Sequence, residues 1–314
     1  MTLSAFVKRC IEQLSPLYPE AEAKSIAFRL LEHYLDIPSY KYISDPEMQL
    51  TVDDAPLRSD SDGRARPDRA SEMLDALDEL ATARPLQYVL GSTEFCGHRF
   101  KVGEGCLIPR PETEELVSRI IDDLYSENDS ESDDAPSSSA SSGHLASDND
   151  SPFSILDLCT GSGCIAWSLA AEFPEAMVYG CDLSDAALRY ACRQRIKVGG
   201  AKPIFFTADV LAVPPAGLPK FDVIVSNPPY ICDSERAAMR PNVLDFEPAE
   251  ALFVPDDDPL KFYRAIARWA DALLRPDGHI YLEINERFGP DVAALFPGSR
   301  ILPDIFGRDR FVVR

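Results

Sequence analysis

The tetrapeptide Asn227-Pro228-Pro229-Tyr230 follows a run of five residues, 222–226, that is typical of a buried strand. Proline fixes φ, supplies no N–H and holds the preceding residue extended, so the tetrapeptide predicts a stiff loop that offers acceptors. The side-chain oxygen of Asn227 and the carbonyl of Pro228 could both accept from an –NH2 group, beside the flat ring of Tyr230. They would aim a poorly nucleophilic amide or amine nitrogen at an electrophilic methyl group. The loop therefore favours nitrogen methylation, although Asn-Pro-Pro alone is more often a turn.

A glycine turn supplies a candidate cofactor site. The apolar run 153–158 leads into Gly161 and Gly163, and a helical pattern follows. Glycine allows a sharp turn and a close approach of a ligand to the backbone. Together with Ala166 the glycines also fit G-x-G-x-x-A, so a dinucleotide site stays open at this point, as does a tight turn without a ligand.

Two acids follow the next strands. Asp182 ends the second strand, where a carboxylate can accept both hydroxyls of a ribose, in sites for either NAD or S-adenosylmethionine. The alternative is that this segment only caps the next helix, through Ser184 or Asp185. Asp209 ends the third strand, where it could accept from an adenine amino group while Val210 packs on the ring. Taken alone, Asp209 is a weak signal.

The elements that must position these residues alternate between strands and helices. This order predicts a doubly wound, mostly parallel α/β sheet whose ligands bind beyond the carboxyl ends of the strands. The final strand follows a short turn and is expected to be antiparallel. The expected strands are 153–160, 176–184, 203–210, 222–226, 279–284, 300–304 and 310–314, and the expected helices between them are 163–174, 185–200, 258–278 and 289–298.

Three segments lie outside this alternation. Residues 1–84 contain two helical patterns, at 19–36 and 69–83, and predict a small helical domain. Residues 85–108 mix glycines with aromatic and β-branched residues and predict a hairpin linker. Residues 126–152 are acidic, rich in serine and without Lys or Arg, so we expect a disordered loop, most simply a tolerated insertion.

The composition restricts the class of protein. The chain has 314 residues, 45% of them hydrophobic, which allows two domains with a sizeable core. Its net charge of −21 disfavours a nucleic-acid backbone as partner. The eight cysteines show no C-x-x-C spacing, so we expect reduced thiols and no metal site. With no signal-like or membrane-spanning stretch, a cytoplasmic protein without a membrane partner is expected.

In this order, the motifs resemble class I S-adenosylmethionine-dependent methyltransferases with an amino-methylating box. The segments 84–100 and 107–117 and the closing "GRDRFVV" narrow the resemblance to the release-factor glutamine N5-methyltransferases, the HemK/PrmC family. The resemblance covers nearly the whole chain. It implies a seven-stranded methyltransferase domain at 109–314, S-adenosylmethionine as cofactor, and methylation of the glutamine in the Gly-Gly-Gln motif of peptide-chain release factors during translation termination. Residues 1–84 would then bind the release factor, and we expect a monomer.

The resemblance also assigns roles to individual residues. The lid near the cofactor falls on Ile108 to Thr113, and Cys159 stands where the family usually has glycine, with a modest effect expected. The loop Asn227–Tyr230 would hold the glutamine side chain. The expected catalytic residues are Asn227, Pro228 and Tyr230, the expected substrate-binding residues are Asn227, Pro228, Pro229 and Tyr230, and the expected cofactor-binding residues are Cys159, Thr160, Gly161, Ser162, Gly163, Asp182, Asp209, Val210 and Asn227.

Three other functions fit parts of the sequence. An amino-methyltransferase that acts on adenine or cytosine in nucleic acid would share the chemistry of Asn227–Tyr230 but would need a basic groove. A dinucleotide-dependent oxidoreductase would fit the glycine turn, yet the four histidines form no obvious proton relay. A non-catalytic scaffold that binds the cofactor is disfavoured by the intact Asn227.

Overall fold

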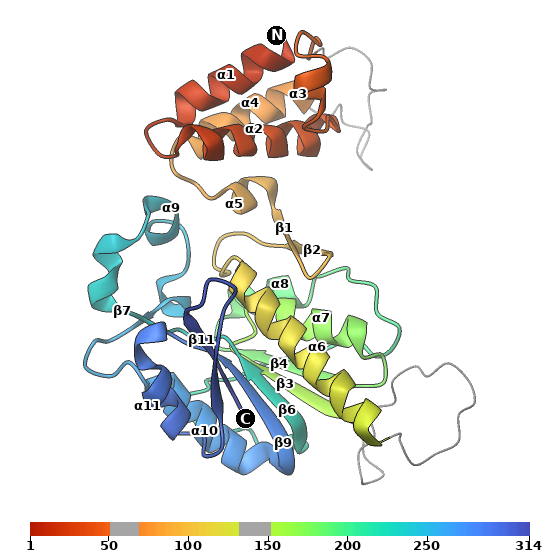
Figure 1. The fold of residues 1–314 in the computed structure, drawn as a ribbon, viewed down its shortest axis with the longest axis vertical. Coiled ribbons are helices and arrows are strands. Elements are labelled where there is room, and N and C mark those ends of the chain that lie inside the picture. Colours follow the sequence, from red (N-terminus) through yellow and green to blue (C-terminus); the bar gives the residue numbers. More distant parts are fainter. Residues whose placement is uncertain (51–68, 132–151) are drawn as a thin grey trace. The chain divides into compact units, whose positions relative to one another are not determined.

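The computed structural model describes residues 1–50, 69–131 and 152–314, which form two compact units (Figure 1). The first, here called the helical unit, comprises Met1–Gly91 together with Pro241–Phe246. The second, the sheet unit, comprises Ser92–Arg240 and Glu247–Arg314. The chain thus leaves the sheet unit once, for a short segment, and then returns to it.

The helical unit is built around an apolar core of its own. Thr2 caps its first helix by accepting from the N–H of Ala5, and apolar residues at helical spacing fill the space between the helices. The core includes Phe6, Leu30 and Leu77, all fully buried. The helices are α1 (Leu3–Leu14), α2 (Glu20–Leu35), α3 (Lys41–Ser44), α4 (Arg69–Leu80), α5 (Leu86–Leu90) and α9 (Pro241–Leu244).

The sheet unit contains the predicted doubly wound sheet. Its seven strands lie in the order β10-β11-β9-β6-β3-β4-β5. The five strands from β9 to β5 are parallel, and β11 is antiparallel to both neighbours, which confirms the expected fold class and the antiparallel last strand. The strands are β3 (Ser154–Leu158), β4 (Met177–Asp182), β5 (Ile204–Thr207), β6 (Phe221–Ser226), β9 (Leu274–Glu283), β10 (Arg300–Pro303) and β11 (Asp309–Val313).

Helices cover both faces of this sheet. On one face, α6 (Pro111–Glu131) and α7 (Cys164–Glu172) bury Leu116 and Trp167. On the other face, α10 (Lys261–Leu273) and α11 (Gly289–Ala294) bury Trp269 and Val292. Every residue of β3 is buried because the strand is covered on both sides (Figure 1).

Short elements complete the sheet unit. A hairpin of β1 and β2 precedes α6, and the small parallel pair β7–β8 follows the Asn-Pro-Pro-Tyr loop. The elements not yet given are β1 (Ser92–Phe95), β2 (His98–Lys101), α8 (Asp185–Ala191), β7 (Ile231–Cys232), η2 (Asp233–Ala238), η3 (Ala249–Ala251), β8 (Phe253–Val254) and η4 (Glu286–Phe288). None of the helices in the described ranges is long and apolar enough to cross a membrane.

The helix α8 is shorter than the sequence pattern suggested. The pattern favoured a helix over 185–200, whereas α8 ends at Ala191. The amide of Gln194 explains the difference, because its oxygen accepts from the N–H of Lys101 and its nitrogen donates to the carbonyls of Lys101 and Ser162. We infer that these three hydrogen bonds, which satisfy a buried amide, stabilise the fold more than a further turn of helix would.

The predicted acidic loop, 126–152, lies largely outside the described residues. The helix α6 continues to Glu131, so the first six positions of that range are helical. Residues 132–151 are not described.

All eight cysteines are free thiols, as the sequence predicted. Only Cys192 is exposed; Cys96 and Cys159 are partly buried, and the other five are buried. Burial raises the pKa of Cys10, Cys96 and Cys106 to about 12.

Candidate active site

The candidate site lies where the parallel strands end. Leu158 pairs with both Ser226 and Cys181, so the residues that follow β3, β6 and β4 meet at one edge of the sheet. The hydroxyl of Ser226 donates to the carbonyl of Leu158 over 2.6 Å, and the N–H of Thr160 donates to Cys181 over 2.9 Å. These bonds hold the carboxyl ends of the three strands beside one another. Doubly wound sheets bind their ligands at this edge.

A cavity of about 440 Å³ opens at this edge, within the usual size range of small-molecule sites. It is mostly apolar, with a few polar side chains at separate points of its wall. Of the predicted cofactor residues, it is lined by Cys159, Gly161, Asp182, Asp209, Val210 and Asn227, and Pro229 joins them. Thr160, Ser162, Gly163, Pro228 and Tyr230 are not among the residues that line it.

Asp182 ties the glycine turn to the next helix. Its Oδ2 accepts from the N–H of Gly161 at 2.8 Å, and its Oδ1 accepts from the N–H of Ser184 at 2.9 Å. Burial raises the pKa of Asp182, while these backbone bonds oppose that rise. Helix α8 is capped by Ser184, whose hydroxyl accepts from Ala187. The carboxylate therefore holds the cavity wall in shape and retains lone pairs for a ligand.

Cys159 adopts a backbone conformation that favours glycine. Its φ is 60°, in the left-handed region, directly after β3. Cys159 therefore takes the glycine-like path despite its Cβ. Such a conformation costs an L-residue roughly 1–2 kcal/mol.

We expect this strain to be measurable by comparing two substitutions. Cys159→Ala removes the thiol but keeps Cβ, whereas Cys159→Gly removes both. At this φ the glycine variant should be more stable than the alanine variant by about 1 kcal/mol in free energy of unfolding. Urea denaturation of the two variants measures the difference, and equal stabilities would contradict the inference of strain.

The remaining residues of the glycine turn face the protein interior. Thr160 and Ser162 are only 4% and 2% exposed. The hydroxyl of Thr160 donates to Asp157, which also accepts from the N–H of Ala166. Gly163 has a φ of 77°, and a Cβ there would lie 3.0 Å from the ring of Phe205. These residues support the turn from the protein interior, while Cys159 and Gly161 form its surface toward the cavity.

Asp157 gives the fold a pH dependence. Burial raises its pKa to about 7, from an ordinary value of 3.8. Because the folded-state pKa is the higher one, Asp157 stabilises the fold fully below about pH 4 and loses that contribution as the pH rises toward 7. Asp157→Asn cannot ionise, so its free energy of unfolding should fall less than that of the wild type between pH 4 and 7. Urea titrations across this range test the difference in slope, and parallel curves would argue against it.

The loop after β6 presents Asn227 to the cavity. Its Nδ2 donates to the hydroxyl of Thr113 over 2.9 Å. Pro228 and Pro229 are buried, and their rings restrict the backbone of the loop. Tyr230 turns its hydroxyl away, and that hydroxyl donates to Glu283 over 2.8 Å. The structure thus places Asn227 and Pro229 at the cavity and Tyr230 behind them.

Glu283, at the end of β9, is a residue that the sequence reasoning missed. It is 1% exposed, and its carboxylate accepts from Thr113 over 2.7 Å as well as from Tyr230. Burial raises its pKa, while these two hydrogen bonds and the nearby Arg310 oppose the rise. The pattern of the strand does not predict this role. The one signal in the sequence is an acidic residue at the end of an otherwise apolar strand, which is unusual.

A second buried acid holds the predicted lid segment. Glu247 accepts from the N–H of Ile108 over 3.0 Å and from the guanidinium of Arg110 over 2.6 Å. It joins two stretches of chain that both reach the cavity wall, through Leu107 and Pro248. Several further residues of that wall were not expected from the sequence: Leu183, Glu250, Phe253, Lys261 and Phe262.

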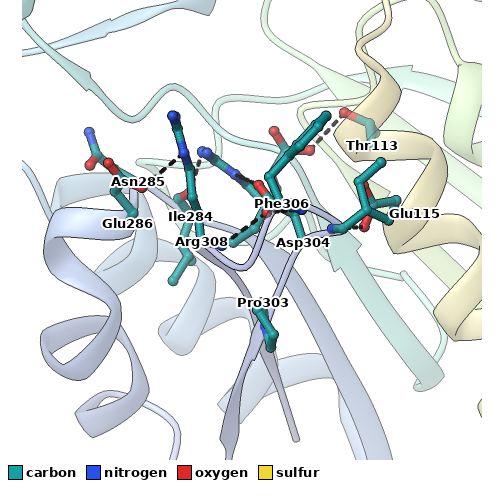
Figure 2. Close-up of polar contacts among 12 residues, drawn as sticks. Thr113, Glu115, Ile284, Asn285, Glu286, Pro303, Asp304, Phe306 and Arg308 are labelled. Carbon is teal, nitrogen blue, oxygen red and sulfur yellow. Dashed lines mark hydrogen bonds and ion pairs between the residues drawn. The ribbon is translucent and has the colours of Figure 1, made fainter.

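A compact turn between β10 and β11 supports the end of β9 (Figure 2). The buried Asp304 accepts from the N–H groups of Phe306 and Arg308, and the N–H of Arg308 in particular lowers the pKa of Asp304. Asp304 also pairs with Arg310, whose guanidinium donates to the carbonyl of Ile284. The turn therefore holds Arg310 beside the residues that follow Glu283.

Comparisons with known proteins agree on a family. Residues 141–243 match the model of the methyltransferase small domain. A release factor glutamine methyltransferase of Bacteroides thetaiotaomicron is 33% identical over 315 residues, covering 99% of this chain and 98% of the relative. That of Flavobacterium psychrophilum is 32% identical over 317 residues, with coverage of 99% and 98%. That of Streptococcus pneumoniae is 38% identical over 245 residues, with coverage of 76% and 77%.

Proposed function

The chain belongs to the release factor glutamine methyltransferases, and from this premise we propose that it methylates the side-chain amide nitrogen of the glutamine in the Gly-Gly-Gln motif of peptide-chain release factors. It is an S-adenosylmethionine-dependent methyltransferase. The observation that carries the proposal is the similarity over the full length of the chain. The position of Asn227 in the wall of the cavity supports it.

The cavity is suited to S-adenosylmethionine, which supplies an electrophilic methyl group when it is bound. We propose that Asp182 accepts hydrogen bonds from the ribose hydroxyls and that Asp209 lies near the adenine amino group. Leu183, Val210 and Phe262 provide apolar wall for the adenine ring. The turn Cys159–Gly163 would border the amino-acid end, with Cys159 and Gly161 at the surface and the other three residues supporting them.

The loop Asn227–Tyr230 would bind the substrate glutamine. We propose that Oδ1 of Asn227 and the carbonyl of Pro228 accept the two hydrogens of the glutamine –NH2 group. This holds the nitrogen in one orientation and favours the positive charge that develops on it as a bond to carbon forms. Pro229 and Tyr230 would keep the loop rigid, Tyr230 through its bond to Glu283.

No general base is required by this arrangement. The amide nitrogen becomes more acidic as it acquires the new bond, and its proton can leave to water afterwards. The acceptors therefore act by positioning the nitrogen and by stabilising its developing charge.

We further propose that residues 1–84 contribute to release-factor binding. Their separate apolar core supports an independent module, although stabilising the rest of the chain remains a compatible role. A nucleic-acid substrate is not favoured by the names of the relatives, and the net charge of −21 opposes one. The monomeric state and the cytoplasmic location stay predictions.

Labelled S-adenosylmethionine and a purified release factor test the proposed function. The expected product is a release factor whose Gly-Gly-Gln glutamine is heavier by one methylene, as located by peptide mass spectrometry. A release factor in which that glutamine is replaced by alanine is the negative control. Label that appears equally in the negative control, or in added DNA or RNA instead, would reject the proposal.

A further inference from the structure

A chain of hydrogen bonds connects the loop that binds the substrate to a buried acid. Asn227 Nδ2 donates to Thr113 Oγ1 over 2.9 Å, and Thr113 Oγ1 donates to Glu283 Oε2 over 2.7 Å. Tyr230 donates to the other oxygen of Glu283 over 2.8 Å. The start of α6, the loop after β6 and the end of β9, which are far apart in the sequence, thus meet at one carboxylate.

The direction of each bond in this chain follows from the carboxylate. An ionised carboxylate only accepts, so the single proton of the Thr113 hydroxyl must point to Glu283. The hydroxyl oxygen of Thr113 can then only accept a hydrogen bond from Asn227. The amide must therefore turn its Nδ2, and not its Oδ1, toward Thr113. In the described part of the chain, Oδ1 of Asn227 accepts no hydrogen bond, and the residue borders the cavity.

We propose that Thr113 and Glu283 are positioning residues that fix which end of the Asn227 amide faces the cavity. The inference rests on the proposed function, since it concerns the acceptor for the substrate –NH2 group. With this polarity Oδ1 is presented as an acceptor. With the reverse polarity Asn227 would present its own –NH2 group to the substrate –NH2 group, and no hydrogen bond could form.

Burial raises the pKa of Glu283, and two hydrogen-bond donors and one cation near the carboxylate partly offset that rise. Arg310, from β11, lies close enough to oppose the rise of its pKa, as do the bonds from Thr113 and Tyr230. Glu112, on α6, acts in the other direction. Tyr263, on α10, donates to the backbone carbonyl of Glu283 over 3.0 Å and so holds the strand end rather than the carboxylate.

Two substitutions of Thr113 distinguish the effect of its hydroxyl on the orientation of the Asn227 amide from the effect of its side-chain packing. Thr113→Val keeps the shape of the side chain but removes the hydroxyl, so the amide of Asn227 loses the contact that orients it. We expect kcat for release-factor methylation to fall at least about tenfold, because small errors in the placement of reacting groups are costly. The Kd for S-adenosylmethionine, measured by calorimetry, should change little. Thr113→Ser restores the hydroxyl and should recover most of kcat.

Thr93→Val is the matched control. Thr93 is also buried, and its hydroxyl donates only to the neighbouring carbonyl of Glu94, at 3.4 Å. Its valine variant should keep the wild-type kcat. The inference is overturned if Thr113→Val retains the wild-type kcat, or if Thr113→Ser is as impaired as Thr113→Val. If the wild type itself fails to methylate the release factor, it is the proposed function that fails.

Discussion

Replacing Asn227 by alanine is expected to lower the rate of release-factor methylation about 100- to 1000-fold, the usual effect of removing one preorganised polar group that acts on the transition state. The amide borders the cavity, and its nitrogen is already engaged by Thr113, so the group lost to the substrate is an acceptor. The effect should fall on kcat. Single-turnover transfer from labelled S-adenosylmethionine at saturating release factor measures it.

Cofactor binding should distinguish this loss from a damaged site. Asn227 is one residue among many in the cavity wall, so calorimetry should find the Kd for S-adenosylmethionine nearly unchanged in Asn227→Ala. Thermal unfolding checks that the variant remains folded. Turnover equal to that of the wild type would refute the role of Asn227, whatever the affinity for the cofactor.

Replacing Asp182 by alanine should have its main effect on cofactor affinity. We expect the Kd for S-adenosylmethionine to rise roughly 10- to 100-fold, because hydrogen bonds to a charged group contribute about 1.5–3 kcal/mol and about 1.4 kcal/mol corresponds to a factor of ten. The same change frees the N–H groups of Gly161 and Ser184, which loosens the cavity wall. Calorimetry on the free enzyme gives the affinity directly.

Asp185→Ala is the matched control for Asp182. Asp185 lies three positions further along, is exposed and is absent from the wall of this cavity. Its removal takes away one negative charge near α8 without touching Gly161. Its Kd for S-adenosylmethionine should stay close to that of the wild type. An affinity of Asp182→Ala equal to that of Asp185→Ala would mean that the ribose contact is wrongly assigned.

The sequence predicted the parts of the site that follow strands directly. In a parallel sheet the carboxyl ends of strands share one edge, so Gly161, Asp182 and Asn227 could be expected together once the strands were recognised. The resemblance to a family added the cofactor and the substrate. The cavity places these residues in one wall, as that argument required.

The parts that could not be predicted depend on contacts between distant segments. Thr113 and Glu283 are separated by 170 positions, and Ile108 and Glu247 by 139. No local sequence pattern reveals either pair, because the contacts depend on how distant segments are arranged in the folded sheet unit. A buried acid also resembles an exposed one in sequence. Glu283 could have been suspected only from its place at the end of an otherwise apolar strand.

The short helix α8 shows a different limit. Helical spacing continued beyond Ala191, and local propensity gave no reason to stop there. Gln194 ends the helix because its amide finds partners on β2 and on the glycine turn, which only the folded chain brings within reach. Tertiary contacts of this kind override propensities that differ by fractions of a kcal/mol per residue.

The distribution of the thiols makes the protein easy to tag at one point. Alkylating dyes react with the thiolate, and burial suppresses that form at Cys159, Cys164 and Cys181 by raising the pKa of each. Cys192 is exposed, at the end of the helix whose first turn borders the cavity. A maleimide fluorophore should therefore attach there selectively in the native protein and report ligand binding by its change in emission, without any cysteine having to be replaced first.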